Sequence, residues 1–237
     1  MNDTYEPAPS MSTSNKLALI DEYASIARAL ASPHRMRLLE QLAQGEKGVD
    51  ALAEKTELSF ANCSQHLQEL RRVGLVTSRR EGKAAIYRLT DDDTLRLMAL
   101  IQKIARQNID RVDEILDGIA GGIERPEPVS REVLAERLAA GDVVVLDIRP
   151  PEEFAAGHIP GALSAPLEDV GKLAESLDPS TPIFAYCRGP YCLYADRAAA
   201  ELRQRGFDAR TVEGGLPDWR ADGRPVATVD RAVDAVI

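Results

Sequence analysis

The stretch Ile183-Phe184-Ala185-Tyr186-Cys187-Arg188-Gly189-Pro190-Tyr191-Cys192 joins a short apolar run to a tight loop that contains glycine and proline. A helix-like segment, 193–205, follows, so the pattern predicts a strand, a loop and a helix. Such a loop directs backbone N–H groups inward at the positive end of a helix dipole, where an anion or a thiolate is stabilised. Cys187 is therefore a candidate nucleophile, and Cys192 lies close enough in the chain to react with it.

The sequence around this loop alternates between apolar runs and helix-like segments. The run 143–146 is uninterrupted, as in a parallel strand that is buried on both faces. This alternation predicts an α/β domain with a parallel sheet, whose active loops lie at the carboxyl ends of the strands. The further predicted strands are 161–165, 183–186 and 209–212, and the predicted helices are 131–140, 152–156, 166–177, 193–205 and a short one around Trp219.

Length and composition set the outer limits. A chain of 237 residues with 44% hydrophobic residues is suited to two domains of about 100 residues each. No run approaches the ~20 apolar residues of a membrane span, and residues 1–14 lack the apolar core of a signal peptide. We therefore expect a cytoplasmic protein with no membrane partner. Three cysteines are too few for a disulfide scaffold, which favours reactive thiols.

Charge is unevenly distributed along the chain. The net charge is −9, with 17 basic and 19 acidic residues in 1–125 and 12 basic and 19 acidic residues in 126–237. Residues 71–88 nevertheless hold six basic residues against Glu81 alone. A local basic patch of this kind is what contact with nucleic-acid phosphates requires.

The first half of the chain reads as helices followed by a hairpin. Helices are predicted at 16–30, 33–44 and 49–55, then a turn at 56–59 with Ser59 as N-cap, and a helix at 60–73. Two short strands, 75–78 and 84–89, enclose the basic hairpin tip 79–83. This order predicts a winged helix-turn-helix, so the chain as a whole is multidomain, with a mainly α part followed by an α/β part.

The helix 60–73 has two different faces. Cys63, Leu67 and Leu70 share one face and should pack inward. That position favours Cys63 as a buried packing thiol; the alternative is that it accepts sulfur or acts as an oxidation switch. Asn, Gln and Ser suit base edges in a major groove, and basic wing residues suit phosphates or the minor groove, whereas the alternative is a merely solvated polar face. The predicted DNA-binding residues are Ala61, Asn62, Ser64, Gln65, His66, Gln68 and Arg72 on the helix and Arg79, Arg80 and Lys83 in the wing.

Residues 29–39, 64–76 and 79–88 resemble the ArsR family of bacterial repressors, and the resemblance covers about 17–118. It implies a homodimer that binds double-stranded operator DNA and releases it when a ligand or a thiol modification arrives. It also implies dimer contacts from the first and last helices, 17–30 and 91–117. Segment 47–55 has no cysteine and the last helix has no histidine, so we predict no metal site. The near-heptad apolar residues of the last helix are Leu97, Ile101, Ile104, Val112 and Ile115.

Residues 128–227 resemble a single rhodanese domain. The resemblance implies that Cys187 carries sulfur and that the backbone amides of 188–192 bind its persulfide. Six residues from Cys187 to Cys192 is the loop size used for sulfur, whereas the related phosphatase and arsenate-reductase loops need one more residue and an arginine where Leu193 stands. The motifs that carry the resemblance are Asp147-Ile148-Arg149 with Glu153-Phe154, Gly157-His158-Ile159-Pro160-Gly161-Ala162, the Cys187 loop, and Gly214-Gly215 with Trp219, Gly223 and Pro225.

Other polar residues near these motifs receive simpler interpretations. Arg149 and Glu153 are expected to form an ion pair with each other, His158 to lie in a structural turn, and Trp219 to belong to the core. Arg188 either attracts an anionic sulfur donor or is simply solvated. Because Cys192 places a second thiol at the end of the loop, it can resolve a persulfide on Cys187.

Together these features predict the domain boundaries and the function. The predicted parts are a disordered tail 1–16, a winged-helix domain 17–118, a linker 119–128, a rhodanese-like domain 129–227 and a tail 228–237. We expect a repressor, without cofactor, that senses or transfers sulfane sulfur from a persulfide, polysulfide or thiosulfate to a thiol acceptor. One alternative is a sulfurtransferase merely tethered to a DNA-binding domain; the other is an arsenite or antimonite sensor using Cys63, Cys187 and Cys192. The predicted catalytic residues are Cys187, Cys192 and Arg188, within a sulfur-binding loop of Cys187, Arg188, Gly189, Pro190, Tyr191 and Cys192.

Overall fold

The computed structural model describes residues 12–123, 127–189 and 191–229. The chain divides into two compact units: Met1–Gln41 with Lys47–Thr90, and Leu42–Glu46 with Asp91–Ile237. The elements up to Thr90 are α1 (Thr13–Leu30), α2 (Pro33–Ala43), β1 (Lys47–Gly48), α3 (Val49–Thr56), α4 (Phe60–Arg72), β2 (Val76–Glu81) and β3 (Ala84–Leu89). The later elements are α5 (Asp93–Asn108), α6 (Asp110–Ala120), α7 (Arg131–Ala140), β4 (Val144–Asp147), α8 (Pro151–Ala156), β5 (Leu163–Ser164), η1 (Leu167–Asp169), α9 (Val170–Ala174), β6 (Ile183–Cys187), α10 (Leu193–Gln204), β7 (Ala209–Gly215) and α11 (Leu216–Ala221).

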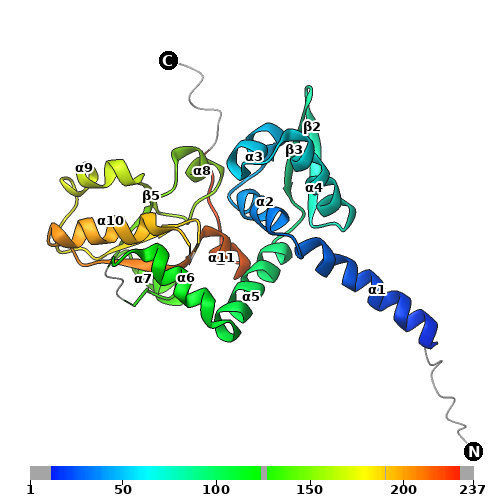
Figure 1. Cartoon of the computed structure of the whole chain (residues 1–237). Helices are drawn as coiled ribbons and strands as arrows, with labels where there is room; N and C mark the ends of the chain where they lie inside the picture. Colours follow the sequence, from blue (N-terminus) through cyan, green and yellow to red (C-terminus); the bar gives the residue numbers. More distant parts are fainter. Residues whose placement is uncertain (1–11, 124–126, 190, 230–237) are drawn as a thin grey trace, which may run out of the picture. The chain divides into compact units, whose positions relative to one another are not determined.

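The first unit has the predicted winged helix-turn-helix architecture (Figure 1). Helix α4 starts where predicted, because the Ser59 hydroxyl accepts the backbone N–H of Asn62 at 3.3 Å. Its apolar residues Cys63, Leu67 and Leu70 are fully buried. The wing strands β2 and β3 pair antiparallel, and β1, which the sequence analysis missed, adds two residues on the other side of β3.

The second unit contains a parallel sheet with strand order β5-β4-β6-β7. Successive side chains of β6 alternate between two cores. Ile183, Ala185 and Cys187 pack on the side of α10, whereas Phe184 and Tyr186 pack on the side that holds Leu134 of α7 and Trp219 of α11. The predicted α/β domain and the core position of Trp219 are thus confirmed, and both faces of the sheet are buried.

The helix expected at 91–117 is in fact two helices, α5 and α6, so that prediction is wrong. Ile109 leaves the helical conformation, with φ −128° and ψ 95°. The Asn108 side chain donates to the Ile104 carbonyl at 2.8 Å, which is the competition with backbone bonding that shortens helices at Asn and Asp. The near-heptad set of apolar residues therefore does not continue along one helix.

Helix α5 is anchored to α11 within the second unit. Arg96 donates to the Ala221 carbonyl at 2.7 Å, and Arg220 pairs with Asp92 at 2.6 Å. The helices after the wing consequently pack with the sheet that holds Cys187. The boundaries 17–118 and 129–227 stay a prediction about domains.

Two smaller differences concern the bounds of predicted helices. The helix predicted at 166–177 is divided between η1 and α9. Helix α1 begins at Thr13, inside the predicted tail 1–16, because the Ser12 hydroxyl accepts the N–H of Asn15 at 3.2 Å as an N-cap. The rest of that tail up to residue 11, most of the tail 228–237 and residues 124–126 of the linker lie outside the described residues.

Candidate functional site

Cys187 ends β6 and Cys192 is the N-cap residue of α10, and the two are joined by a disulfide with 6.2 Å between their Cα atoms. The Cys187 side chain is 1% exposed, and Cys192 is half-buried. In this oxidised state the backbone N–H of Cys192 donates to the Gly189 carbonyl at 3.1 Å. The two cysteines predicted to react with each other are therefore close enough to form a disulfide. Tyr191 is exposed, and Pro190 lies outside the described residues.

The loop is held against the end of β7 by an approach that only glycine permits. A Cβ atom on Gly215 would collide with the Cys187 carbonyl oxygen and the Gly189 backbone nitrogen. The Gly215 N–H donates to the Asp218 carboxylate at 2.8 Å, and burial raises the pKa of Asp218. Asp218 is a supporting residue that the sequence analysis missed.

Arg188, directly after the nucleophile candidate, forms a forked ion pair with Glu153 of α8. Its Nε and Nη2 lie 2.8–3.1 Å from the two Glu153 carboxylate oxygens. Glu153 is 3% exposed, so the guanidinium of Arg188 compensates the negative charge of a buried carboxylate. Arg188 is thus neither simply solvated nor directed at the cavity described below, and its predicted catalytic role stays a prediction.

The expected pairing of Arg149 with Glu153 is wrong. Arg149 is fully buried and pairs instead with Asp147, at 2.5 Å between Nη2 and Oδ2. The Tyr186 hydroxyl donates to the same Asp147 oxygen at 2.6 Å and accepts the Ile159 N–H at 3.0 Å. Burial and the Asp147 charge raise the pKa of Tyr186, which keeps its hydroxyl protonated. Asp147, Arg149 and Tyr186 thus form a buried, hydrogen-bonded cluster next to the Cys187 loop, which we call the platform.

Gln44, the residue that follows α2, contacts this platform through its side chain. Its Oε1 accepts from Arg149 at 3.2 Å, and its Nε2 donates to the backbone carbonyl of Arg188 at 3.2 Å. Gln44 is 5% exposed. No sequence signal identified it, because the contact spans 144 residues of chain.

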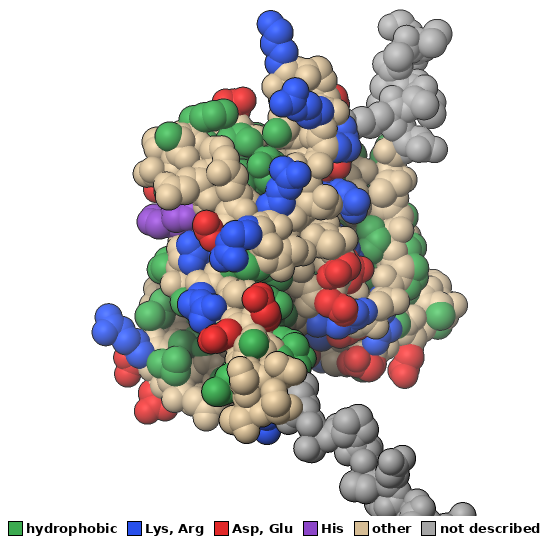
Figure 2. All heavy atoms as spheres, turned by 90° about the vertical axis from the view of Figure 1, so that its right-hand side faces the viewer, with side chains coloured by type: hydrophobic (Ala, Val, Ile, Leu, Met, Phe, Trp, Pro, Cys, Tyr) green, Lys and Arg blue, Asp and Glu red, His purple; other side chains and the backbone are tan. Residues whose placement is uncertain are grey.

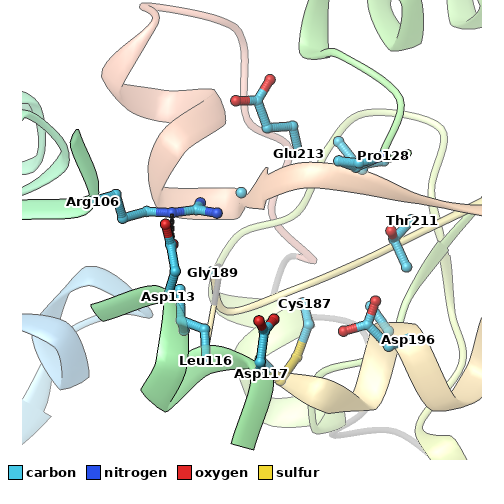
Figure 3. Close-up of a pocket in the computed structure, with 14 residues that line it drawn as sticks. Arg106, Asp113, Leu116, Asp117, Pro128, Cys187, Gly189, Asp196, Thr211 and Glu213 are labelled. Carbon is cyan, nitrogen blue, oxygen red and sulfur yellow. Dashed lines mark ion pairs between the residues drawn. A yellow bond between two sulfur atoms is a disulfide. The ribbon is translucent and has the colours of Figure 1, made fainter. Parts of the chain in front are cut away.

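A cavity of about 520 Å³ opens beside the Cys187 loop. Its lining includes Cys187, Gly189 and Cys192 of the loop, Asp196 of α10 and Glu213 of β7. Helices α5 and α6 complete it, with Arg106 and then Asp113, Leu116 and Asp117. Figure 3 shows Asp117 and Asp196 on the two sides of Cys187. From the sequence we expect these helices to make dimer contacts, and their position at the cavity has no signal in the sequence.

The predicted DNA-binding residues lie together on α4 and the wing. Ala61, Asn62, Gln65, Gln68 and Arg72 are exposed, and Ser64 and His66 are half-buried. Burial lowers the pKa of His66, with smaller contributions from Arg35 and His34, which favours its neutral form. In the wing, Arg79, Arg80 and Lys83 are all exposed. Figure 2 shows basic side chains on the hairpin projection and further ones along the same face.

Comparison with known proteins matches both parts of the chain. The rhodanese-like domain family matches residues 130–222, and a helix-turn-helix domain family matches residues 30–79. The HTH-type transcriptional regulator Rv0324 of Mycobacterium tuberculosis is 38% identical over 211 residues, which cover 89% of this chain and 92% of that protein.

The chain belongs to the ArsR-family transcriptional regulators that carry a rhodanese-like domain.

Two further relatives each resemble one part of this regulator. A sulfurtransferase of Allochromatium vinosum is 33% identical over 100 residues, covering 41% of this chain and 92% of that protein. A solution structure described as the homodimeric winged helix-turn-helix DNA-binding domain of Mb0332 from Mycobacterium bovis is 39% identical. It covers 43% of this chain and 94% of that one, with a TM-score of 0.40.

The third thiol of the regulator is separate in character from the first two. Cys63 is fully buried, its Sγ lies 3.8 Å from the Val49 carbonyl, and burial raises the pKa of the thiol. The predicted packing position is confirmed. Arsenite binds thiolates, so this protonated, buried thiol does not favour the arsenite alternative.

Other expected features of the regulator stand as follows. The His158 ring stacks on the Phe154 ring with 3.8 Å between the ring centroids. Its Nδ1 lies 2.9 Å from the Phe154 carbonyl oxygen, in keeping with a structural role. In the described stretches no three or more His, Cys, Asp or Glu side chains gather as a metal site would require. Of the helices that the structure describes, none is both long and apolar enough to span a bilayer.

Proposed function

We propose that this regulator is a homodimeric repressor whose affinity for operator DNA is controlled by sulfane sulfur loaded on Cys187. The observation that carries the proposal is the disulfide between Cys187 and Cys192 beside a cavity open to a small molecule. A pair of thiols that can close a bond inside a substrate-sized cavity is a reversible covalent switch. The predicted operator contacts of α4 and the wing supply what such a switch would control.

The chemistry balances without a metal or cofactor. The Cys187 thiolate attacks the outer sulfur of a hydropersulfide RSSH, forming Cys187–S–SH and releasing the thiolate RS⁻. The Cys192 thiolate then attacks the Cys187 Sγ, forms the disulfide and expels HS⁻. The two protein thiols are oxidised by two electrons and the transferred sulfur is reduced to sulfide, and a dithiol reductant resets the pair.

The environment of Cys187 supports the first step. Its sulfur lies at the amino-terminal end of α10, a 12-residue helix whose dipole favours a thiolate and, after transfer, a persulfide anion. Arg188 acts here as a positioning residue, because its fork on Glu153 holds the residue next to the nucleophile.

Homodimer formation is supported by apolar side chains that the chain leaves exposed. On α1, Leu17 is 60%, Ile20 is 48% and Tyr23 is 61% exposed, at the spacing of one helix face. On α5, Leu100 and Ile104 are also about half exposed. These side chains lie in the segments 17–30 and 91–117, which the family resemblance assigns to dimer contacts.

The coupling from the loop toward α2 is proposed to pass through Gln44. This amide bonds the carbonyl of Arg188, which adjoins Cys187, and it follows directly on the last residue of α2. A loop that rearranges between its disulfide and dithiol states changes the partner of a buried polar group, which shifts an equilibrium between two arrangements.

The test is fluorescence anisotropy of the full chain on DNA from its own promoter, reduced against treated with polysulfide, with intact mass on the same samples. Wild type should lose DNA affinity at least tenfold as mass is gained or the disulfide closes. Cys187→Ser should keep the reduced-state affinity and show no response, and Gln44→Leu should load sulfur with a weakened response. Cys63→Ala is the matched thiol control and should respond as wild type. A Cys187→Ser protein that still responds would overturn the proposal.

A second candidate is catalytic sulfur transfer, which the similarity to the Allochromatium vinosum sulfurtransferase favours. In that function sulfur on Cys187 passes to a thiol acceptor repeatedly while DNA affinity stays unchanged. Many turnovers per chain in the presence of excess thiol, together with constant anisotropy, would establish it over the sensor.

A further inference from the structure

The cavity beside Cys187 is walled by more negative than positive charge. Four carboxylates line it, from Asp113 and Asp117 of α6, Asp196 of α10 and Glu213 of β7. Arg106 of α5 is the one lining residue with a positive charge among those described, so the lining has a formal net charge of −3. Figure 3 shows Arg106 extended toward Asp113 at the α6 side of the cavity.

Three basic residues of the cavity, the loop and the platform each pair with a carboxylate. Arg106 already pairs with Asp113, at 3.6 Å between Nε and Oδ1. Arg188 has its guanidinium on Glu153, and Arg149 is fully buried on Asp147. An anionic donor entering the cavity therefore meets the Asp117 carboxylate, because Arg106 is paired with Asp113 and the charge of Arg131 acts on Glu213.

The interior of the loop has the opposite preference. The amino-terminal end of α10 stabilises one negative charge at the Cys187 sulfur, where the transferred atom resides. A donor is thus favoured if it brings its single reacting sulfur to the loop and no further negative charge to the walls. Thiosulfate brings two negative charges, and its leaving group, sulfite, must depart through the same carboxylates.

We propose that this cavity selects hydropersulfides on uncharged or cationic carriers and discriminates against dianionic donors such as thiosulfate, with Asp117 of α6 as a specificity-determining residue. The inference rests on the proposed function, since it names the class of sulfur donor that Cys187 accepts. Transfer from such a donor moves the terminal SH group to the Cys187 thiolate and releases the carrier thiolate, which takes up a proton from solvent.

Two donors of opposite charge test the proposal, each with its loading rate divided by its rate with a small free thiol so that intrinsic reactivity cancels. The persulfides of cysteamine and of 2-mercaptoethanesulfonate have the same two-carbon chain, with an ammonium in one and a sulfonate in the other. Reduced, desalted full-length protein is mixed with each, and the initial rate of sulfur addition is followed by intact mass. Thiosulfate is the third donor, and each rate is measured at 20 and 300 mM salt.

We expect the cysteamine persulfide to load about three- to tenfold faster than the sulfonate persulfide at low salt, and thiosulfate to be slower still. High salt should narrow the ratio, because the screening length falls from over 20 Å to under 6 Å. Asp117→Asn should reduce the ratio about twofold or more. Glu175→Gln, which removes an exposed carboxylate at the end of α9 outside the cavity lining, should leave it unchanged.

Equal rates for the two persulfides at low salt, or a ratio that Asp117→Asn leaves untouched, would overturn the inference. Loading from none of the donors would overturn the proposed function and this inference with it. Charge-selective loading with unchanged DNA affinity would overturn only the regulatory proposal, and the donor class would stand.

Discussion

The polar face of α4 and the Cys187 loop differ in where their working atoms lie. The face of α4 consists of exposed side chains from 13 consecutive residues, supported by one buried stripe. The Cys187 side chain is 1% exposed, and its surroundings come from Gln44, Glu153, Gly215 and Asp218, which are far apart in the chain. A surface for a large, charged partner needs only a helix with the right outward residues, whereas a reactive sulfur needs an enclosure.

The two regions also use arginine in opposite ways. In the wing, Arg79 and Arg80 are exposed, and Arg79 pairs with Glu81 of the same strand, at 2.5 Å between Nη1 and Oε2. Beneath the loop, Arg149 is fully enclosed by Asp147, the Gly157 carbonyl and Gln44. The same residue type is therefore exposed at the predicted DNA-binding surface of one unit and buried in a charge pair in the other.

The largest effect should come from breaking the buried pair. Arg149→Leu leaves the Asp147 charge uncompensated, so we expect a loss of about 3–5 kcal/mol of unfolding free energy. Trp219 is the single tryptophan and lies in the second unit, so its fluorescence during urea unfolding reports on this unit. Arg80→Leu in the exposed wing is the matched control and should change that transition by less than about 0.5 kcal/mol. Equal destabilisation by both variants would contradict the contrast.

A smaller effect should follow from removing one hydroxyl of the platform. Tyr186→Phe takes a donor from Asp147 and an acceptor from the Ile159 N–H, which should cost about 1–3 kcal/mol in the same transition. Because Arg149 still pairs with Asp147, the loss should be less than for Arg149→Leu. An unchanged unfolding free energy for Tyr186→Phe would contradict this role of the hydroxyl and would mean that water replaces it.

The smallest effect in free energy should be on DNA binding by the wing. The double variant Arg80→Ala, Lys83→Ala should weaken operator binding about tenfold per wing in about 0.1 M salt. It should also lower the slope of log K against log salt by about 2 per wing, because each protomer of the proposed dimer loses two phosphate contacts. Lys172→Ala, in α9 of the second unit, should leave both quantities unchanged. An unchanged salt slope in the double variant would mean that the wing does not touch phosphates.

Local rules accounted for most of the elements. Ser59 caps α4 as predicted, and Ser130 caps α7 in the same way, since a hydroxyl three residues before an unbonded helix N–H is a short-range arrangement. The apolar stripe of α4 followed from a period of 3.6 residues, and the buried strand β6 followed from a short continuous apolar run. The helix break at Ile109 was not predicted. Asn108 and Asp110 disfavour the helix only weakly, whereas the apolar pattern on both sides of them strongly indicates one helix.

The sequence by itself determined the two fold classes, the candidate nucleophile and its partner thiol, because each depends on residues within one helix turn or one loop. Only the tertiary structure decided which charges pair. Arg149 has Asp147 two residues before it and Glu153 four residues after it, and the enclosed position of its guanidinium selects Asp147 and gives Glu153 to Arg188. The placement of α6 at the cavity and of Gln44 beneath the loop was equally a tertiary outcome. Contacts between residues many positions apart arise from packing and leave no local pattern in the chain.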